Sequence, residues 1–218
     1  MIYCKNLTFG YDLNHTLFKK VSFKLNNGEI GVIVGLNGCG KTSLLNCIGG
    51  QLNDYQGEIH ATNCRYIVKI PEFAEDLIGI DYIDMLMTLN GKKNKEDLLE
   101  LIEHLCAGKD LDKPIKETYQ ITRKIIILIS SLCLDNNTIL LDDPFSSFDL
   151  TSQKLIINII KKLKNQGKTI LIASNVIDYG FDLADELFIL HKGRLKQVKN
   201  SFLEYNQYEK ELLSLITA

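Results

Sequence analysis

The chain has 218 residues, a length that fits one domain or one domain with a smaller lobe. Its hydrophobic fraction of 45% and charged fraction of 24% are ordinary for a globular protein with a core. The formal net charge of −2 excludes a global positive field that recruits nucleic acid or an anionic membrane. The longest apolar stretch, residues 125–134, is about half the roughly 20 residues that span a bilayer. A membrane role therefore requires a separate membrane partner.

The first 34 residues predict short strands, which lead into a helix. Residues 21–25 alternate apolar and polar side chains, and residues 30–34 form a continuous apolar run typical of a strand buried on both faces. A glycine-rich loop follows, and then a helix is expected over residues 41–48. Further strands are predicted over residues 57–61 and 65–70.

The middle of the chain changes character. From about residue 81 to residue 115, apolar residues recur at helical spacing with Glu and Lys between them, which predicts a small helical lobe. After one more apolar helix, strands and helices alternate, which predicts an α/β fold with a mainly parallel sheet flanked by helices. The expected elements are helices over 121–134, 152–163 and 202–216 and strands over 138–141, 169–173 and 187–190.

Residues 35–42, Gly-Leu-Asn-Gly-Cys-Gly-Lys-Thr, match the phosphate-loop pattern G-x-x-x-x-G-K-[ST]. The glycines let backbone N–H groups approach phosphate oxygens, and the following helix offers its positive end. Lys41 adds a charge for the β- and γ-phosphates, and the Thr42 hydroxyl reaches magnesium. We therefore expect ATP and Mg²⁺ to bind here. The predicted nucleotide-binding residues of this segment are Gly35, Leu36, Asn37, Gly38, Cys39, Gly40, Lys41, Thr42 and Ser43.

About 100 residues downstream, an apolar strand ends in two carboxylates, Asp142 and Asp143. Asp142 at the end of the strand is placed to hold magnesium, as the acidic partner of a phosphate loop. The alternative is a solvated Asp-Asp turn before a proline. Beside a phosphate loop, the interpretation as a magnesium ligand is favoured.

The six cysteines contain no C-x-x-C pair, which favours reduced thiols in a cytosolic protein over a structural zinc site. Cys39 lies inside the phosphate loop, near a helix N-terminus and Lys41. That setting can lower a thiol pKa, so redox control through Cys39 is a further hypothesis.

With these motifs, the chain resembles the ATP-binding subunit of ABC transporters from Leu7 to about Leu195. The resemblance implies a P-loop NTPase of ABC type, with an N-terminal antiparallel β portion. It implies a single ATP-binding domain over residues 1–218, with a helical subdomain at about 73–134 inserted in the RecA-like core. It also implies that Tyr11 stacks on adenine, the alternative being an exposed tyrosine at the end of a strand.

The same resemblance implies the partners of the chain. They are a separate transmembrane permease and a second ATP-binding subunit, in a homodimer or a heterodimer, on the cytoplasmic inner face of the cell membrane. No nucleic acid partner is expected. Residues 146–149 fall where the family has the D-loop, which crosses to the opposite subunit. The small size favours a compact exporter, for peptides or for antimicrobial self-protection, by analogy alone.

Four positions depart from the family pattern. Asp143 replaces the catalytic glutamate and is one methylene shorter, a displacement of roughly 1 Å that can cost about 10²-fold in rate. Asn175 replaces a histidine at the γ-phosphate, and its amide carries no positive charge. Glu72 stands where a glutamine approaches the metal. Residues 118–122 replace the signature Leu-Ser-Gly-Gly-Gln, and neither its serine nor its two glycines are kept.

The expected activity is therefore that of a slow ATPase that drives or gates a permease. A non-catalytic ATP-binding regulatory subunit of a membrane complex and a soluble ABC-type ATPase are the alternatives. The predicted catalytic residues are Lys41, Asp143 and Asn175, and the predicted metal ligands are Thr42, Asp142 and Glu72.

Overall fold

The structure is a computed structural model, and it describes residues 1–12, 15–89, 95–106, 110–133, 136–146, 148–176 and 182–198. The chain divides into two compact units. The helix expected over residues 202–216 lies outside the described residues. The single domain with an inserted helical subdomain stays a prediction. The first unit is built from Met1–Tyr66, Asn137–Pro144 and the chain from Leu163 onward, and the second from Ile67–Asn136 and Phe145–Lys162.

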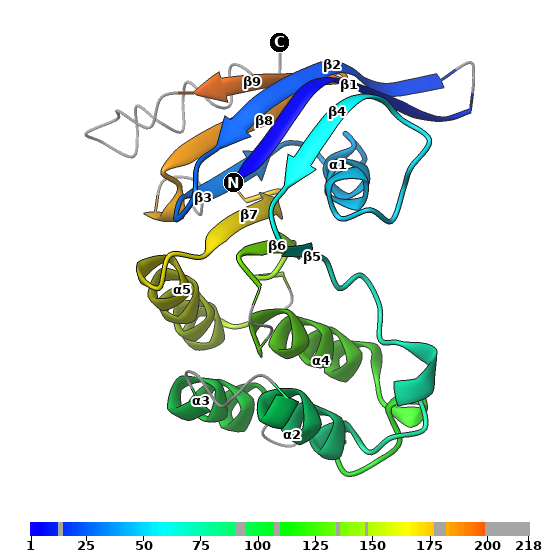
Figure 1. Cartoon of the computed structure of the whole chain (residues 1–218). Helices are drawn as coiled ribbons and strands as arrows, with labels where there is room; N and C mark the ends of the chain where they lie inside the picture. Colours follow the sequence, from blue (N-terminus) through cyan, green and yellow to red (C-terminus); the bar gives the residue numbers. More distant parts are fainter. Residues whose placement is uncertain are drawn as a thin grey trace. The chain divides into compact units, whose positions relative to one another are not determined.

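The first unit contains two sheets (Figure 1). In its described part, an antiparallel sheet has the order β2-β1-β4, and a second sheet has the order β5-β6-β7-β3-β8-β9. The second sheet is parallel from β5 to β8, and β9 pairs antiparallel with β8. The strands are β1 (Ile2–Asp12), β2 (His15–Leu25), β3 (Ile30–Val34), β4 (Gln56–Ala61), β5 (Cys64–Arg65), β6 (Thr138–Asp142), β7 (Thr169–Ser174), β8 (Glu186–His191) and β9 (Arg194–Val198).

Strands β3, β6 and β7 end at the same edge of the parallel sheet. Pairing places Val34 beside Ser174 and Asp142 beside Ala173. Because ligands of open α/β sheets bind outside the carboxyl ends of the strands, this edge is where a site is expected. The phosphate loop follows β3 directly, so the fold brings it next to Asp142.

Helix α1 (Lys41–Ile48) follows the loop and is held in the core of the first unit. Its apolar side chains are buried among residues of both sheets, and each such burial stabilises the fold by roughly 1.5–3 kcal/mol. The start of α1 is therefore fixed against the strands that carry the site. The cluster includes Leu44, Leu45 and Ile48 of α1, Phe9 and Phe18 of the antiparallel sheet, and Leu140, Leu171 and Phe188 of the parallel sheet.

The second unit is helical. Helices α2 (Gly79–Leu89) and α3 (Lys95–Cys106) both pack on α4 (Gln120–Cys133). Two short 3₁₀ turns, η1 (Glu72–Ala74) and η2 (Ile115–Glu117), flank them, and α5 (Leu150–Asn165) lies mostly in this unit. Across the described residues, none of the helices combines the length and apolar character that crossing a bilayer requires.

The mainly parallel sheet, the N-terminal antiparallel portion and the helical lobe are confirmed. The strand predicted over 65–70 is wrong, because β5 ends at Arg65 and the chain enters the second unit at Ile67. The expectation of short strands over the first 34 residues is also wrong, since β1 and β2 are 11 residues each. Irregular register between them interrupts the alternation on which strand prediction depends.

Candidate nucleotide-binding site

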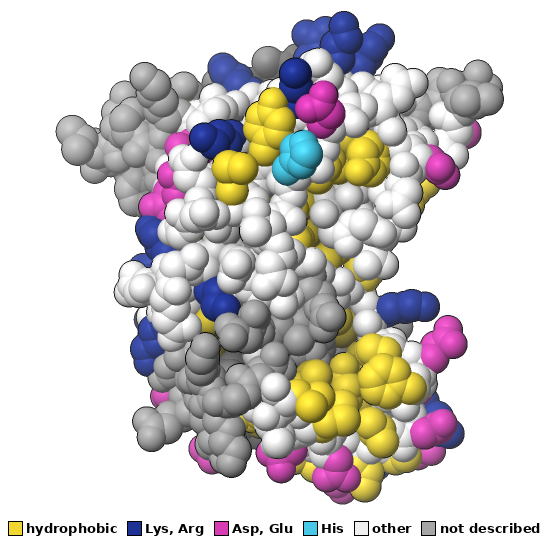
Figure 2. Space-filling view, in the orientation of Figure 1, with side chains coloured by type: hydrophobic (Ala, Val, Ile, Leu, Met, Phe, Trp, Pro, Cys, Tyr) yellow, Lys and Arg dark blue, Asp and Glu magenta, His cyan; other side chains and the backbone are white. Residues whose placement is uncertain are grey.

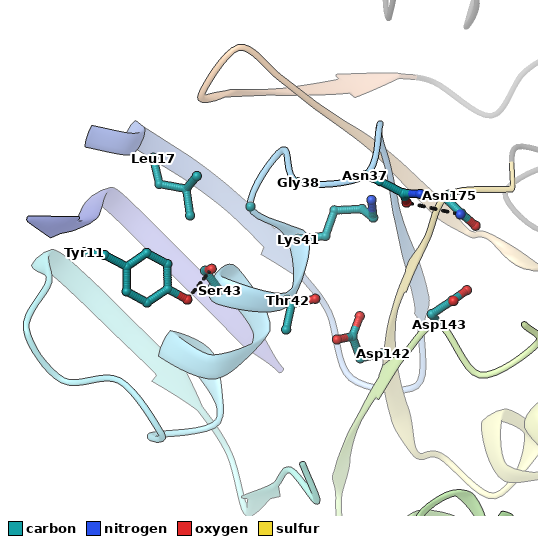
Figure 3. Close-up of a pocket in the computed structure, with 11 residues that line it drawn as sticks. Tyr11, Leu17, Asn37, Gly38, Lys41, Thr42, Ser43, Asp142, Asp143 and Asn175 are labelled. Atoms are coloured by element: carbon teal, nitrogen blue, oxygen red, sulfur yellow. Dashed lines mark hydrogen bonds between the residues drawn. The ribbon is translucent and has the colours of Figure 1, made fainter. Parts of the chain in front are cut away.

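A cavity of about 480 Å³ opens at the carboxyl edge of the parallel sheet in the first unit (Figure 3). This size is within the range of small-molecule sites. The cavity brings together residues from the strand ends, the phosphate loop and α1. Its lining is Tyr11, Leu17, Asn37, Gly38, Gly40, Lys41, Thr42, Ser43, Asp142, Asp143 and Asn175.

The phosphate loop has a backbone that only glycine adopts easily. Gly38 has φ 78° and Gly40 has φ 107°, both in the left-handed region. Gly40 immediately precedes α1, and no side chain caps the first turn of that helix. The first N–H groups of α1 are therefore open to an anion. At Gly35 a Cβ would lie 2.4 Å from the Leu190 carbonyl oxygen, so the loop packs closely on β8.

The Lys41 side chain folds back onto the phosphate loop. Its side chain is buried, and Nζ donates to the carbonyl oxygens of Gly35 at 2.7 Å and Leu36 at 3.0 Å. Both acceptors are neutral, so they orient the ammonium group without cancelling its charge. The loop thus presents a positive charge at the cavity where an anionic phosphate would lie.

The hydroxyls of Thr42 and Tyr66 lie near Asp142 and favour its charged form. Burial raises the pKa of Asp142 above its usual range, and the charge of Asp143 adds to this, while the two hydroxyls oppose it. Thr42 and Asp142 supply the hard oxygen atoms that Mg²⁺ prefers. The described residues contain no cluster of three His, Cys, Asp or Glu side chains. Such a sparse set fits Mg²⁺, which is usually held by one or two carboxylates, substrate phosphates and water.

Asp143 and Asn175 both reach the cavity, as their sequence positions predict. Asp143 has φ 47°, and its N–H donates to the Ala173 carbonyl oxygen at 2.8 Å. Asp tolerates this left-handed conformation better than longer side chains do. Asn175 Nδ2 donates to Asn37 Oδ1 at 3.2 Å, which ties the end of β7 to the phosphate loop (Figure 3).

Tyr11 lies at the other end of the cavity. Its hydroxyl is hydrogen-bonded to Ser43 Oγ at 2.9 Å, and its side chain is 69% exposed. Phe9 contacts the Tyr11 ring edge-on, with centroids 5.0 Å apart, so the tyrosine is braced while remaining accessible. Leu17 was not predicted from the sequence. It lies on β2, and a Cβ at Gly40 would be 3.0 Å from its Cγ, a contact that a strand pattern does not reveal.

Some predicted residues do not line the cavity. Gly35, Leu36 and Cys39 belong to the loop but are absent from the lining. The expected lowering of the Cys39 pKa is wrong: burial raises it, and this effect outweighs the charge of Lys41. Glu72 is exposed on η1 in the second unit, and its role as a metal ligand stays a prediction.

Residues 118–122, which are predicted to replace the family signature, lie in the second unit at the start of α4. Thr118 is buried and its hydroxyl donates to the Ile115 carbonyl oxygen at 2.8 Å, whereas Tyr119 is 73% exposed. Arg123 forms a fork with Glu75 at 2.8 and 2.5 Å. Lys124 Nζ donates to the Ser146 carbonyl oxygen at 3.1 Å. The basic side chains after this segment are therefore engaged within the unit.

Comparisons with known proteins agree with this geometry. Residues 18–146 match the family described as ABC transporter. The chain is 26% identical over 193 residues to an uncharacterised ABC transporter ATP-binding protein, YthP of Bacillus subtilis, covering 85% of this chain and 81% of YthP. The fold resembles a solved ATP-binding subunit of an ABC transporter, with TM-score 0.78, 20% identity and full coverage of both chains. It also resembles a dimeric bacterial ABC transporter cassette, with TM-score 0.72, 19% identity, and coverage of 93% of this chain and 100% of the cassette.

Proposed function

This chain belongs to the ABC transporter family as an ATP-binding subunit, and we propose that it binds MgATP and hydrolyses it slowly to drive or gate a separate permease. The observation that carries the proposal is one cavity that joins the open start of α1, Lys41 and the Thr42–Asp142 pair. Each of these features recognises a different part of a metal-bound triphosphate.

Binding follows from the residues that line the cavity. The loop N–H groups and Lys41 hold the phosphates, while Thr42 and Asp142 supply oxygens for magnesium. The metal, when bound, neutralises charge that develops on the phosphoryl oxygens. Tyr11 offers an exposed, braced ring on which adenine stacks, a contact worth roughly 1–3 kcal/mol per base.

Hydrolysis requires a group that orients the attacking water, and Asp143 is the carboxylate available for this in the cavity. Its side chain is short, and its amide anchors it to β7 through Ala173. The Asn175 amide donates a hydrogen bond, but it has no ionisable proton and no charge. We therefore expect turnover well below the roughly 10 s⁻¹ that is typical of enzymes.

The substitution Asp143→Glu tests this account of slow hydrolysis. Glutamate extends the carboxylate by one methylene, so turnover should rise by up to about 10²-fold. The left-handed φ of 47° opposes the longer side chain and reduces the gain. The measurement is phosphate release at saturating MgATP, with Asp143→Asn as the matched control that removes the charge. If Asp143→Asn is as active as the unmodified chain, Asp143 does not act on the water.

Partners follow from the family and from the surface of the second unit. We propose a dimer of ATP-binding subunits, supported by the similar dimeric cassette, and a permease on the inner face of the membrane. Hydrophobic side chains gather on one part of the second unit (Figure 2). Phe73 is 70% exposed, and Ile78 and Ile80 near it in the chain are exposed as well. An exposed apolar patch of this kind is suited to a protein partner.

The experiment that tests the proposal compares ATP affinity and ATP turnover with and without the cognate permease. Tight MgATP binding with slow turnover that the permease stimulates supports it. Binding of ATP without any hydrolysis in the complex favours the alternative of a non-catalytic regulatory subunit. The presence of Asp143 and Asn175 in place of the family residues also favours that alternative. Failure to bind ATP contradicts both. The soluble ABC-type ATPase and the peptide or antimicrobial cargo stay predictions.

A further inference from the structure

A second cavity, of about 450 Å³, lies in the first unit on the hairpin of β8 and β9, and we call it the hairpin cavity. A volume of this size is within the range of small-molecule sites. Its lining among the described residues is separate from that of the nucleotide-binding cavity. The proposed binding and hydrolysis of ATP use none of these side chains. They are Ile189, His191, Lys192, Arg194 and Lys196.

The strand register explains why these side chains share one face of the hairpin. Strands β8 and β9 pair antiparallel, with His191 opposite Arg194 and Ile189 opposite Lys196. Because side chains alternate across a sheet, these two pairs lie on one face, and the pair between them lies on the other. The intervening pair contains Leu190, which is buried in the core of the first unit. The hairpin cavity is therefore on the opposite face from this core.

The turn of the hairpin is held in place by β2. Lys192 has φ 46° and Gly193 has φ 73°, the left-handed pair that a two-residue hairpin turn requires. The Lys19 N–H donates to the Gly193 carbonyl oxygen at 2.9 Å, and a Cβ at Gly193 would lie 2.9 Å from the Leu17 carbonyl oxygen. The basic side chains of the hairpin cavity thus extend from a fixed backbone, which reduces the ordering that a ligand has to impose.

Positive charge gathers at the hairpin cavity, and its described lining contains no acidic residue. Lys192, Arg194 and Lys196 are all exposed there, in a chain whose formal net charge is −2. Arg194 and Lys196 lie on the same face of β9, so their charges repel each other. Across the described residues, neither of them takes part in an ion pair. An anion in the cavity would offset this repulsion.

His191 adds a buried polar atom that the fold leaves unsatisfied. Its Nε2 is buried, and among the described residues it has no hydrogen-bond partner. A buried nitrogen without a partner destabilises the fold, because it loses the hydrogen bond that water would provide. A ligand oxygen that accepts a hydrogen bond from Nε2–H removes this cost. Ile189, with 2% of its surface exposed, supplies an apolar wall on the same face.

We propose that the hairpin cavity binds a small soluble organic anion. Arg194 and Lys196 hold its phosphate or carboxylate head, and His191 Nε2 donates a hydrogen bond to the same group. The apolar body of the ligand lies against Ile189 and the aliphatic stems of the basic side chains. Arginine suits this role because its guanidinium group matches two oxygens of such a head at once. The proposal does not depend on ATP binding, since the two cavities share no lining residue.

The first test measures binding of phenyl phosphate, which joins a phosphate to an apolar ring, by isothermal titration calorimetry. Arg194→Gln should weaken binding by at least about tenfold, as loss of a charge-assisted hydrogen bond does. Lys24→Gln is the matched control, an equal change of charge at an exposed residue of β2 outside the described lining, and it should leave the affinity unchanged. Equal losses in both variants would overturn the site, and so would the absence of saturable binding to the unmodified chain.

Two variants of His191 separate hydrogen bonding from packing. His191→Phe keeps a ring without nitrogen, so affinity for phenyl phosphate should fall about fivefold. His191→Gln supplies an amide donor in place of Nε2 and should restore the affinity to within about twofold of the unmodified chain. If His191→Phe binds phenyl phosphate as tightly as the unmodified chain, the nitrogen is not part of the site.

Other probes define the class of ligand. Phenyl phosphate should bind about tenfold more tightly than inorganic phosphate, because its ring buries apolar surface, and equal affinities would contradict the apolar wall. Benzyl alcohol lacks the charge and should bind far more weakly, so equal binding would contradict an anion site. Vesicles that contain phosphatidic acid test a lipid headgroup as the source of the same chemistry. Vesicle binding that Arg194→Gln abolishes, without binding of phenyl phosphate, would overturn a soluble ligand.

Lys41→Ala distinguishes the hairpin cavity from the nucleotide site, because a phosphate ester also suits the phosphate loop. The affinity for phenyl phosphate should be the same in Lys41→Ala as in the unmodified chain. A loss of affinity in Lys41→Ala with none in Arg194→Gln would place the probe in the phosphate loop and overturn the proposal. Failure of the chain to bind ATP, with phenyl phosphate still bound through Arg194, would reject only the proposed function.

Discussion

Two helix starts of this molecule are built in opposite ways: that of α1, after the phosphate loop, and that of α4, where the sequence predicts the degenerate family signature. At the start of α1, Gly40 has φ 107°, no side chain caps the helix, and Lys41 adds a charge. At the start of α4, Thr118 turns its hydroxyl back to Ile115, and the side chain of Tyr119 is 73% exposed. The start of α1 therefore presents backbone groups without side chains, whereas the start of α4 presents side chains.

The difference shows that a helix N-terminus alone does not make an anion site. Both helices have a positive end, but an anion gains from it only when N–H groups are within hydrogen-bond reach. Glycine provides that approach at α1, and its absence from residues 118–122 removes it at α4. We therefore infer that this chain keeps its own nucleotide site better than the site it would complete for a partner subunit.

The largest expected effect comes from Lys41→Ala, which removes the charge at the start of α1. ATP affinity should fall by about 100-fold, because a charge-assisted contact with phosphate is worth roughly 1.5–3 kcal/mol. Isothermal titration calorimetry measures the change, and Lys41→Arg serves as the control that keeps the charge. Unchanged affinity in Lys41→Ala would show that the phosphate loop is wrongly assigned.

The next effect tests the role of glycine itself. Gly40→Ala places a Cβ at φ 107° and 3.0 Å from Leu17 Cγ, and the left-handed conformation costs roughly 1–2 kcal/mol for a residue other than glycine. Affinity for ATP should fall about tenfold. Gly167→Ala is the matched control, since φ is 84° there with open space around it, away from the cavity. The same loss of affinity in both variants would mean that the strain acts on stability and not on the site.

A change at the start of α4 tests the comparison from the other side. Tyr119→Gly exposes the backbone before α4, so ATP turnover of the dimer should rise several-fold. The upper limit is the roughly 10²-fold increase in rate that one added backbone donor can supply. The affinity of the chain for ATP should stay the same. Phosphate release is measured, and Tyr119→Phe keeps the bulk as a control. Equal turnover in both variants would show that the side chain is not the obstacle.

The smallest effect concerns the fork that anchors α4. The hydrogen bond from Arg123 lowers the pKa of Glu75, so the pair stabilises the fold above the ordinary pKa of glutamate, and this contribution is lost as the pH falls through the lowered value. Glu75→Gln should therefore lower the free energy of unfolding by about 1 kcal/mol at neutral pH, as partly exposed pairs do. The difference should shrink below about pH 4 in urea unfolding experiments. A difference that is the same at every pH would indicate a loss of packing instead.

The parts of the site that are local in sequence were predictable. The phosphate loop is eight consecutive residues, and Asp142 stands at the end of a continuous apolar strand. The missed residues come from contacts between distant segments: Tyr66 lies near Asp142, and Leu17 faces Gly40. The early end of β5 could not be predicted either, because the sequence does not show where the chain leaves the sheet. The Arg123–Glu75 fork joins residues 48 positions apart, which no local pattern reveals.

The most direct test of the central claim is ATP turnover by the purified chain with its permease, at saturating MgATP and with binding measured in the same preparation. The predicted result is saturable MgATP binding that depends on Lys41, together with turnover well below about 10 s⁻¹. Turnover at or above about 10 s⁻¹ would contradict the separation of binding from hydrolysis that Asp143, Asn175 and Tyr119 imply.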